Sequence, residues 1–402
     1  MIEKGDDYMH NFNASIDRRH TNSIKYEGMD FMYDTTDMMP FWIADMDLAT
    51  PQPILDALRQ RLEHPILGYT TWKNDAFYEP VKHWYKTRFN TRVINNDLMY
   101  SPTVLYTITE AIRALTREGE GVLVNIPSYN AFLTLIEANR RVVVPSPFVF
   151  DGDDYKMDFD AFESLCQRAD MKVFLLCNPH NPTGKVFTAE ELDEMVDICR
   201  AHDVFIIADE IHMDFVRNEQ GHQSLINWMK PDSKILVTTC LGKTFNISGI
   251  PHAFYVTKNR FMKMELTRQM MAAGVGNPSV LALSAIEAGY MHGADWVDAV
   301  NDFILQNMRF VEAYVKTYLN DVLTVHVPDA TFLLWIDFSK SGYSEDDVQH
   351  ALQKVGKVAL GIGSTYTVED STHFRLNVAC DHARLEEGMK RIRTAFDWLK
   401  ER

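Results

Sequence analysis

The stretch Thr238-Thr-Cys-Leu-Gly-Lys-Thr-Phe-Asn246 follows an apolar run, residues 235–237, that is typical of a buried strand. Lys243 therefore lies just beyond a strand end. Two further polar motifs come earlier in the chain, Asn178-Pro-His-Asn-Pro-Thr-Gly184 and Ala208-Asp-Glu-Ile-His212. An amine, a carboxylate and an amide carried on successive strand ends can together hold an aldehyde cofactor and act on an amino acid.

Short apolar runs alternate with segments of helical periodicity from about residue 100 onwards. In one such segment, Thr188 and Glu191 form a capping box ahead of an apolar helical face. Strands that are apolar on both faces and alternate with helices predict an α/β fold, with a mainly parallel sheet covered on both sides. Ligands of such sheets bind beyond the carboxyl ends of the strands, where all three motifs lie. The predicted strands are residues 121–126, 173–177, 204–208, 235–239 and 253–256.

The chain has 402 residues, more than one ordinary domain, and its pattern changes after about residue 290. A long helical stretch, 295–319, leads into predicted strands at 332–338 and 373–378 and a closing helix. This order predicts a second, smaller α+β domain. We predict an N-terminal segment that packs on the small domain, a large cofactor-binding domain and a small C-terminal domain, at residues 1–50, 51–290 and 291–402.

Composition argues against several classes of protein. The formal net charge is −16, from 40 basic and 56 acidic residues, which disfavours binding to nucleic acid. The sequence contains no run of about 18 apolar residues, so we predict no membrane span. Residues 1–9 lack the apolar core of a secretory signal. The five cysteines form no Cys-x-x-Cys pair, and we predict a cytoplasmic protein without a metal site.

Each of the three motifs also has a more ordinary interpretation. A lone lysine such as Lys243 is most often a solvated surface residue. Gly242-Lys-Thr244 also occurs in Walker-type phosphate loops, but that interpretation fails because position 237 is valine where the loop needs glycine. Asp209 at a strand end is more often a turn or helix-cap residue, and Asn181 in a Pro/Gly cluster is more often a turn residue.

Several motifs occur along the chain in order: Ser101-Pro-Thr-Val104, Pro127-Ser-Tyr129, Asn181-Pro-Thr-Gly184, Asp209-Glu-Ile-His212, Gly242-Lys-Thr-Phe-Asn246 and Phe374-Arg-Leu-Asn377. Over nearly the whole chain, this order resembles the fold-type I pyridoxal-phosphate enzymes of the aminotransferase class I/II family. Within that family it is most similar to cystathionine β-lyases of the MalY/PatB type, through Pro40-Phe-Trp-Ile-Ala-Asp-Met-Asp-Leu48, Gly68-Tyr-Thr-Thr-Trp-Lys-Asn-Asp75 and Asp209-Glu-Ile-His-Met-Asp214. The resemblance implies a large domain with a mostly parallel, seven-stranded sheet between helices, beside a smaller α+β domain.

The resemblance implies roles for four of these residues around the ring of pyridoxal phosphate. Lys243 would bind the cofactor's aldehyde covalently and later carry the substrate's Cα proton. Asp209 would pair with the pyridinium nitrogen, and Asn181 would donate to the ring oxygen and contact the substrate carboxylate. Tyr129 would stack on the ring face, although an aromatic residue at such a turn also packs in cores.

The same resemblance implies where the phosphate and carboxylate groups are bound. The backbone amides of Thr103 and Val104, at a helix start, would bind the phosphate. Tyr69 would reach the phosphate and the substrate of a neighbouring subunit, which makes the active site a property of a homodimer. Arg375 would hold the substrate carboxylate in a bidentate pair.

Three positions depart from the family pattern. His212 stands where aminotransferases usually carry a tyrosine, so the ring oxygen would meet an imidazole donor or none. Pro251 replaces the phosphate-binding arginine that usually lies eight residues after the lysine, and Cys240 replaces the serine three residues before it. The phosphate site therefore loses one cation and one hydroxyl. The missing arginine fits the carbon–sulfur lyases better than the aminotransferases.

We predict a pyridoxal-phosphate-dependent carbon–sulfur β-lyase that converts L-cystathionine or another cysteine S-conjugate to pyruvate, ammonia and a thiol. An aminotransferase is the nearest alternative, because the same lysine serves both reactions. A regulatory protein on the same fold is a second alternative, and the intact polar residues argue against a purely non-catalytic role. Candidate walls of the substrate pocket are Trp42, Trp72 and Tyr106, for each of which core packing is the more ordinary role.

Overall fold

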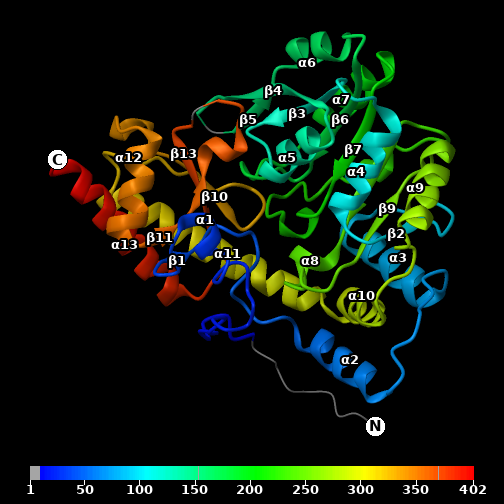
Figure 1. Cartoon of the computed structure of the whole chain (residues 1–402), viewed down its shortest axis with the longest axis horizontal. Coiled ribbons are helices and arrows are strands. Elements are labelled where there is room, and N and C mark those ends of the chain that lie inside the picture. The colour runs from blue at the N-terminus through cyan, green and yellow to red at the C-terminus, as the bar shows by residue number, and fades with distance from the viewer. Residues whose placement is uncertain (1–9, 153, 370) are drawn as a thin grey trace.

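The structure is a computed structural model that describes residues 10–152, 154–369 and 371–402, so residues 1–9, which bear on the secretory-signal prediction, lie outside it. Within the described residues, a central sheet of eight strands lies between two layers of helices (Figure 1). Strands from β8 through β4 run parallel to one another, whereas β9, β2 and β5 pair antiparallel. In spatial order the strands are β2 (Leu98–Ser101), β9 (Ala253–Val256), β8 (Ile235–Thr239), β7 (Phe205–Asp209), β6 (Met171–Cys177), β3 (Gly121–Ile126), β4 (Val142–Phe150) and β5 (Tyr155–Met157).

The sheet confirms the predicted α/β fold and adds one short strand to the predicted seven. That strand, β5, pairs only with the end of β4, where Phe148 lies opposite Met157. The sequence between them contains Asp151, Gly152 and Asp154 and interrupts the apolar pattern, which is why periodicity did not identify β5. The strands predicted at 121–126, 235–239 and 253–256 coincide with β3, β8 and β9.

Alternation along β6 shows why both faces of the sheet are covered. Val173, Leu175 and Cys177 pack with α4, α5 and α9, while Phe174 and Leu176 belong to the core on the opposite face, with α3, α6, α7 and α10. The helices that cover the sheet are α3 (Asp75–Phe89), α4 (Val104–Leu115), α5 (Asn130–Ala138), α6 (Phe159–Cys166), α7 (Ala189–Ala201), α9 (Arg260–Ala273) and α10 (Val280–His292).

Among the described residues, none of the helices of the chain combines the length and hydropathy needed to span a bilayer.

A second sheet belongs to the C-terminal part of the chain, with β13 in its centre between β10 and β12. A parallel pair joins β1 to β11, so the N-terminal segment lies on this part. The remaining elements are α1 (Met29–Tyr33), β1 (Met39–Pro40), α2 (Gln52–Glu63), α8 (Leu241–Thr244), α11 (Ala294–Tyr318), β10 (Leu333–Asp337), α12 (Glu345–His350), β11 (Val358–Ala359), β12 (Gly361–Ile362), β13 (His373–Asn377) and α13 (His382–Lys400).

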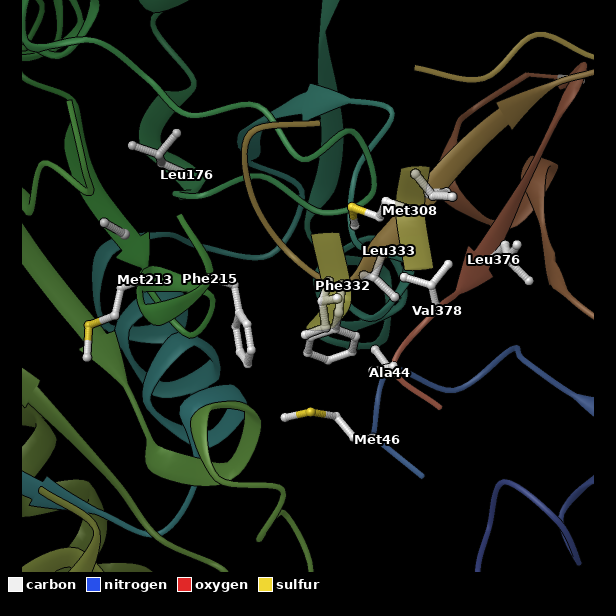
Figure 2. Packing of buried hydrophobic residues seen from close by; sticks show 14 of the residues in the cluster. Ala44, Met46, Leu176, Met213, Phe215, Met308, Phe332, Leu333, Leu376 and Val378 are labelled. Carbon is white, nitrogen blue, oxygen red and sulfur yellow. The ribbon is translucent and has the colours of Figure 1, made fainter. Parts of the chain in front are cut away.

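One hydrophobic cluster extends across both parts of the chain. Figure 2 shows Phe215, which follows β7, facing Phe332 before β10, and their ring centroids are 5.0 Å apart. Met46 of the N-terminal segment and Met308 of α11 belong to the same cluster. The two parts therefore share a packed core, which holds the strand ends of the central sheet against β13.

Candidate active site

Strand register brings the predicted polar residues to one edge of the central sheet. Asp209 at the end of β7 lies opposite Cys177 of β6 and Thr238 of β8. The chain leaves β6 towards Asn181 and leaves β8 towards Lys243 on the short helix α8. The amide, the carboxylate and the amine therefore meet beyond the carboxyl ends of parallel strands, as such sheets predict.

These residues line a cavity of about 180 Å³, which we call the inner cavity. Apart from Ala44, its walls come from residues 103–252. Most of the residues that the sequence singles out for the cofactor line it, and so do all three residues that depart from the family pattern. The singled-out residues in its wall are Thr103, Val104, Tyr129, Asn181, Asp209, His212, Cys240, Lys243 and Pro251.

Burial governs the charges in the inner cavity. Burial raises the pKa of Asp209 to about 7, and the hydrogen bond that its carboxylate accepts from the Ile211 backbone N–H at 3.0 Å offsets only part of this effect. The pKa of Lys243 is lowered by burial, and its Nζ donates to the Ala44 carbonyl at 2.6 Å. A carboxylate and an amine that are both biased towards their neutral forms are typical of a site that binds a charged partner.

Two histidines in the inner cavity are neutral. Burial lowers the pKa of His212 to about 3, and within the described part of the chain its buried Nδ1 has no hydrogen-bond partner. His252 Nε2 accepts from the Leu241 backbone N–H at 3.0 Å, so its proton lies on Nδ1, 2.6 Å from the Ile250 carbonyl. Burial lowers the pKa of His252 to about 4, so this ring adds no cation to the cavity.

The helix start at α4 supplies backbone donors. Thr103 is the N-cap residue, and its Oγ1 accepts from the Tyr106 N–H at 3.0 Å. The amides of the first turn have no partner inside the helix, so this end favours an anion. Ser248 also lines the cavity, so the wall contains a serine hydroxyl although position 240 is cysteine, which the sequence analysis did not anticipate.

Close packing at α8 explains one glycine. A Cβ on Gly242 would lie 2.9 Å from Ser248 Oγ and 3.2 Å from Cys240 Sγ. Either contact would displace a side chain of the cavity wall. Position 242, beside Lys243, therefore needs glycine, because the turn that carries Ser248 lies too close for a side chain there.

A second cavity, of about 540 Å³, adjoins the first and shares Lys243, Tyr129, Ala44 and Leu105 with it. We call it the outer cavity. Arg375 of β13 lies in its wall, where Nη1 donates to Asn181 Oδ1 at 3.1 Å and Nη2 donates to the Trp42 carbonyl at 2.6 Å. The guanidinium carbon also lies 4.9 Å from the centroid of the Tyr366 ring.

Residues 42–48, which we call the strap, pass between the two parts of the chain and are held by side chains from both. Asn377 of β13 donates to the Ile43 and Asp45 carbonyls at 2.7 and 2.6 Å. Asn246, after α8, donates to the Met46 and Leu48 carbonyls at 2.9 and 2.8 Å. Lys243 and Arg375 bind two more carbonyls of the same strap, so its position depends on both cavity walls.

Three predicted residues lie outside both cavities. Tyr69 is fully exposed, at 101%, and lines neither cavity of its own chain. Trp72 is buried against Phe77, and Tyr106 also contributes to neither wall. Of the three aromatic wall candidates, Trp42 alone lines the outer cavity.

Comparison with known proteins places this architecture in a family. Residues 36–392 match the protein family described as aminotransferase class I and II. The chain belongs to that family. It is 36% identical to the protein MalY of Escherichia coli, with 95% of this chain and 97% of that protein covered, and 33% identical to the cystathionine β-lyase PatB of Bacillus subtilis, with 96% and 100% covered. The PLP-bound C–S lyase of Staphylococcus hominis superposes with a TM-score of 0.89 at 28% identity, over 96% of this chain and 98% of that one.

The family motifs contained two asparagines to which the sequence analysis gave no role. Asn246 and Asn377 end the Gly-Lys-Thr-Phe-Asn and Phe-Arg-Leu-Asn motifs, and both bind the strap. Their partners are backbone carbonyls, which every residue type carries, so the sequence contained no sign of these contacts. Tyr366, Met32 and Tyr33 line the outer cavity without any sequence signal.

Proposed function

We propose that this chain is a pyridoxal-phosphate-dependent carbon–sulfur β-lyase that acts on cysteine S-conjugates. The observation that carries the proposal is that Lys243 lines both cavities, with Asp209 in the wall of the inner cavity and Arg375 in the wall of the outer cavity. Arg375 can hold an α-carboxylate while Lys243 reaches the neighbouring Cα. Full-length similarity to MalY and to the lyase PatB supports the same activity.

The residues of the inner cavity fit pyridoxal phosphate. The buried Asp209 carboxylate has no cation in its hydrogen-bond range among the described residues, and a pyridinium N–H would satisfy it. The unpartnered His212 Nδ1 lies in the same wall and offers a contact for the ring oxygen. Tyr129 offers a stacking surface, and the α4 helix start with Ser248 offers donors for a phosphate.

When bound, pyridoxal phosphate stabilises negative charge at the substrate's Cα. Arg375 orients the substrate through its carboxylate, and Asn181 orients Arg375. Lys243 Nζ accepts the Cα proton, because burial lowers its pKa and makes the neutral amine accessible. The β-carbon–sulfur bond then breaks, sulfur leaves as a thiolate, and hydrolysis of the three-carbon remainder yields pyruvate and ammonia.

We further propose that the active site is completed in a homodimer. Tyr69 follows Ile66 and Leu67, and all three side chains are mostly exposed, at 101%, 67% and 59%. An apolar exposed run of this kind is typical of an interface between chains. Tyr69 would then reach the inner cavity of the partner subunit. A Tyr69→Phe variant with weaker cofactor binding and unchanged dimerisation in sedimentation would support this role, whereas a monomeric parent protein would exclude it.

We also propose that the protein works in the cytoplasm. All five cysteines are free thiols in the structure, and four of them are buried. Free thiols persist in reducing compartments, which makes an oxidising environment a poor fit. Fractionation of cells that make the protein tests this assignment.

The deciding experiment measures pyruvate and free thiol from a cysteine S-conjugate, with added pyridoxal phosphate and no 2-oxo acid. We expect equal amounts of both products and a loss of at least about 10³-fold in Lys243→Ala. Lys316→Ala, on the exposed face of α11, is the matched control and should retain full activity. Conversion of the cofactor to its pyridoxamine form without pyruvate would instead identify an aminotransferase, which the family match also accommodates.

A further inference from the structure

Two basic residues of the N-terminal segment also hold the strap, Arg18 and Lys25, and we call them the clamp. Arg18 donates to the Asp45 carboxylate with two nitrogens, from Nη2 to Oδ2 at 2.6 Å and from Nη1 to Oδ1 at 3.1 Å. The same Nη1 donates to the Met46 carbonyl at 3.2 Å. Arg18 therefore binds a side chain and a main-chain oxygen of the strap at once.

Lys25 holds the strap from a buried position. Its Nζ donates to Asp47 Oδ2 at 2.8 Å and to the Asp45 carbonyl at 3.2 Å, and its own carbonyl accepts from Trp42 Nε1 at 3.0 Å. Both members of the Lys25–Asp47 ion pair are buried. Such a pair contributes little net stability, because the cost of removing two charges from water offsets their attraction. Stability alone is therefore a poor explanation for Lys25.

The clamp acts on the part of the strap that contacts Lys243. The Ala44 carbonyl, which accepts from Lys243 Nζ at 2.6 Å, and the Asp45 nitrogen belong to one planar peptide group. The clamp binds Asp45 through both its carboxylate and its carbonyl. Because the peptide plane is rigid, fixing Asp45 in this way also fixes the direction of the Ala44 oxygen.

This oxygen suits an amine that has to take a proton. A carbonyl can only accept, so Lys243 uses an N–H for it and keeps the lone pair of Nζ free. After proton uptake the same contact becomes a stronger, charge-assisted hydrogen bond. A fixed Ala44 carbonyl therefore both orients the neutral amine and stabilises the ammonium that forms.

Several charges act on the same amine. Burial has the largest effect on the pKa of Lys243 and lowers it, as Arg375 does, whereas nearby acidic groups raise it. Among these described groups, the clamp binds Asp45. The titratable and charged groups within electrostatic range of Lys243 are Cys240 before α8, Asp45 of the strap, Arg375 of β13, and Asp209 and His212 at the end of β7.

We propose that Arg18 and Lys25 are positioning residues of the reaction, which hold the Ala44 carbonyl against Lys243 Nζ by way of Asp45. Neither residue lines the inner or the outer cavity, so they act on Lys243 only through the strap. This inference rests on the proposed lyase function, because it concerns the amine that takes the substrate's Cα proton.

Steady-state kinetics of the holoenzyme gives the first test, with Arg18→Ala and Lys25→Met. We expect kcat for pyruvate release to fall about tenfold in both variants, because a displaced base transfers protons slowly. KM should change less than about threefold, since Arg375 keeps its contact with Asn181. Arg19→Ala is the matched control and should keep the parent kcat, because Arg19 pairs only with the exposed Asp17 among the described residues.

A second measurement follows Lys243 in the cofactor-free protein. Its labelling by an amine-reactive reagent is measured by mass spectrometry as a function of pH. Loss of a fixed Ala44 carbonyl disfavours the ammonium, so the midpoint of labelling should move to lower pH in both clamp variants and stay in place in Arg19→Ala. Removal of a cation by itself would favour the ammonium and move the midpoint to higher pH. The direction therefore separates positioning from charge.

The two measurements decide the inference together. An unchanged kcat in both clamp variants, or a labelling midpoint that stays in place or moves to higher pH, overturns it. Arg18→Ala keeps the test available if Lys25→Met does not fold, because the Arg18 side chain is partly exposed and Asp47 retains Lys25. A parent protein that releases no pyruvate and thiol overturns the proposed function instead, and the labelling midpoints still test the contact between the strap and Lys243.

Discussion

The inner and outer cavities share Lys243 and Tyr129 but are built in different ways. The inner cavity consists of strand ends, helix starts and the turns between them, almost all from the central sheet. The outer cavity combines three distant parts of the chain: α1 with the strap, the region of α4 and α5, and the segments around β12 and β13. Polar groups in the inner cavity are set by local geometry, whereas the outer cavity is an apolar space that exists only when those parts pack together.

The sharpest test of this difference compares two buried carboxylates five residues apart. Asp209→Asn should reduce kcat/KM about 10³-fold and shift the visible absorbance of the bound cofactor, since Asp209 lines the inner cavity. Asp214 lines neither cavity and accepts from Trp84 Nε1 at 2.9 Å and Thr244 Oγ1 at 2.6 Å. Asp214→Asn should keep the absorbance and lower the free energy of unfolding by about 1–2 kcal/mol. If both variants lost the same activity and had the same cofactor absorbance, the two carboxylates would not differ in their role at the inner cavity.

The electrostatics of the inner cavity predict a pH dependence in the cofactor-free protein. Burial raises the folded-state pKa of Asp209 to about 7, above its ordinary value of 3.8, so the folded state binds the extra proton between these values. The contribution of Asp209 to stability is therefore full below about pH 4 and is lost as pH rises through 7, by on the order of 4 kcal/mol.

The Asp209→Asn variant lacks this titration, so comparing it with the parent protein separates the effect of Asp209 from that of the buried histidines. The pKa values of those histidines are lowered, so their contribution to stability rises with pH instead of falling. Thermal or urea unfolding of both apoproteins between pH 4 and pH 8 measures the effect. The difference in unfolding free energy should move in favour of the variant as pH increases. A constant difference would mean that the carboxylate stays ionised throughout.

In the outer cavity, Arg375→Lys should raise KM for the amino-acid substrate about 100-fold, because a lysine cannot form the paired contacts of the guanidinium. The absorbance of the bound cofactor should be unaffected, since Arg375 does not line the inner cavity. Steady-state kinetics with a cofactor titration separates the two quantities. Loss of the cofactor in this variant would show that the two cavities are not independent.

The strap between the cavities should contribute to stability through its carbonyls. Asn377→Ala removes the side-chain donor of the Ile43 carbonyl and leaves the Asp45 carbonyl with Lys25 Nζ, at 3.2 Å, so it should lower the free energy of unfolding by about 2 kcal/mol. Thr317→Ala, on the exposed side of α11, is the control and should change it by less than about 0.5 kcal/mol. Urea unfolding measures both variants, and equal midpoints would contradict a strap held from both sides.

Much of the inner cavity could be predicted because its residues follow elements with strong local patterns. Asp209 directly ends an apolar run, Thr103 caps a helix, and Lys243 follows another apolar run. Parallel strands bring such positions to one edge whatever the rest of the chain does. Ser248 and His252 were missed because their approach depends on the turn after α8, which has no periodic signal.

The outer cavity could be predicted only in part. Arg375 was identified by resemblance, but its partner Asn181 is 194 residues away and its partner Trp42 is 333 residues away. Of the aromatic candidates, Trp42 lines the wall, whereas Trp72 and Tyr106 do not. A side chain that packs in a core and one that lines a cavity have the same composition and periodicity, and only the neighbours distinguish them.

The sequence by itself determined the α/β sheet and the polar groups at the strand ends, because local hydrophobic periodicity and turn chemistry specify these, and the order of its motifs indicated the family by resemblance. The tertiary structure alone decided which carbonyls the strap presents to Lys243, Arg375, Asn246 and Asn377, and which apolar side chains enclose the outer cavity. Both depend on contacts between segments that lie far apart in the sequence. These contacts are made by backbone carbonyls and by packing surfaces, which cannot be recognised from residue type alone.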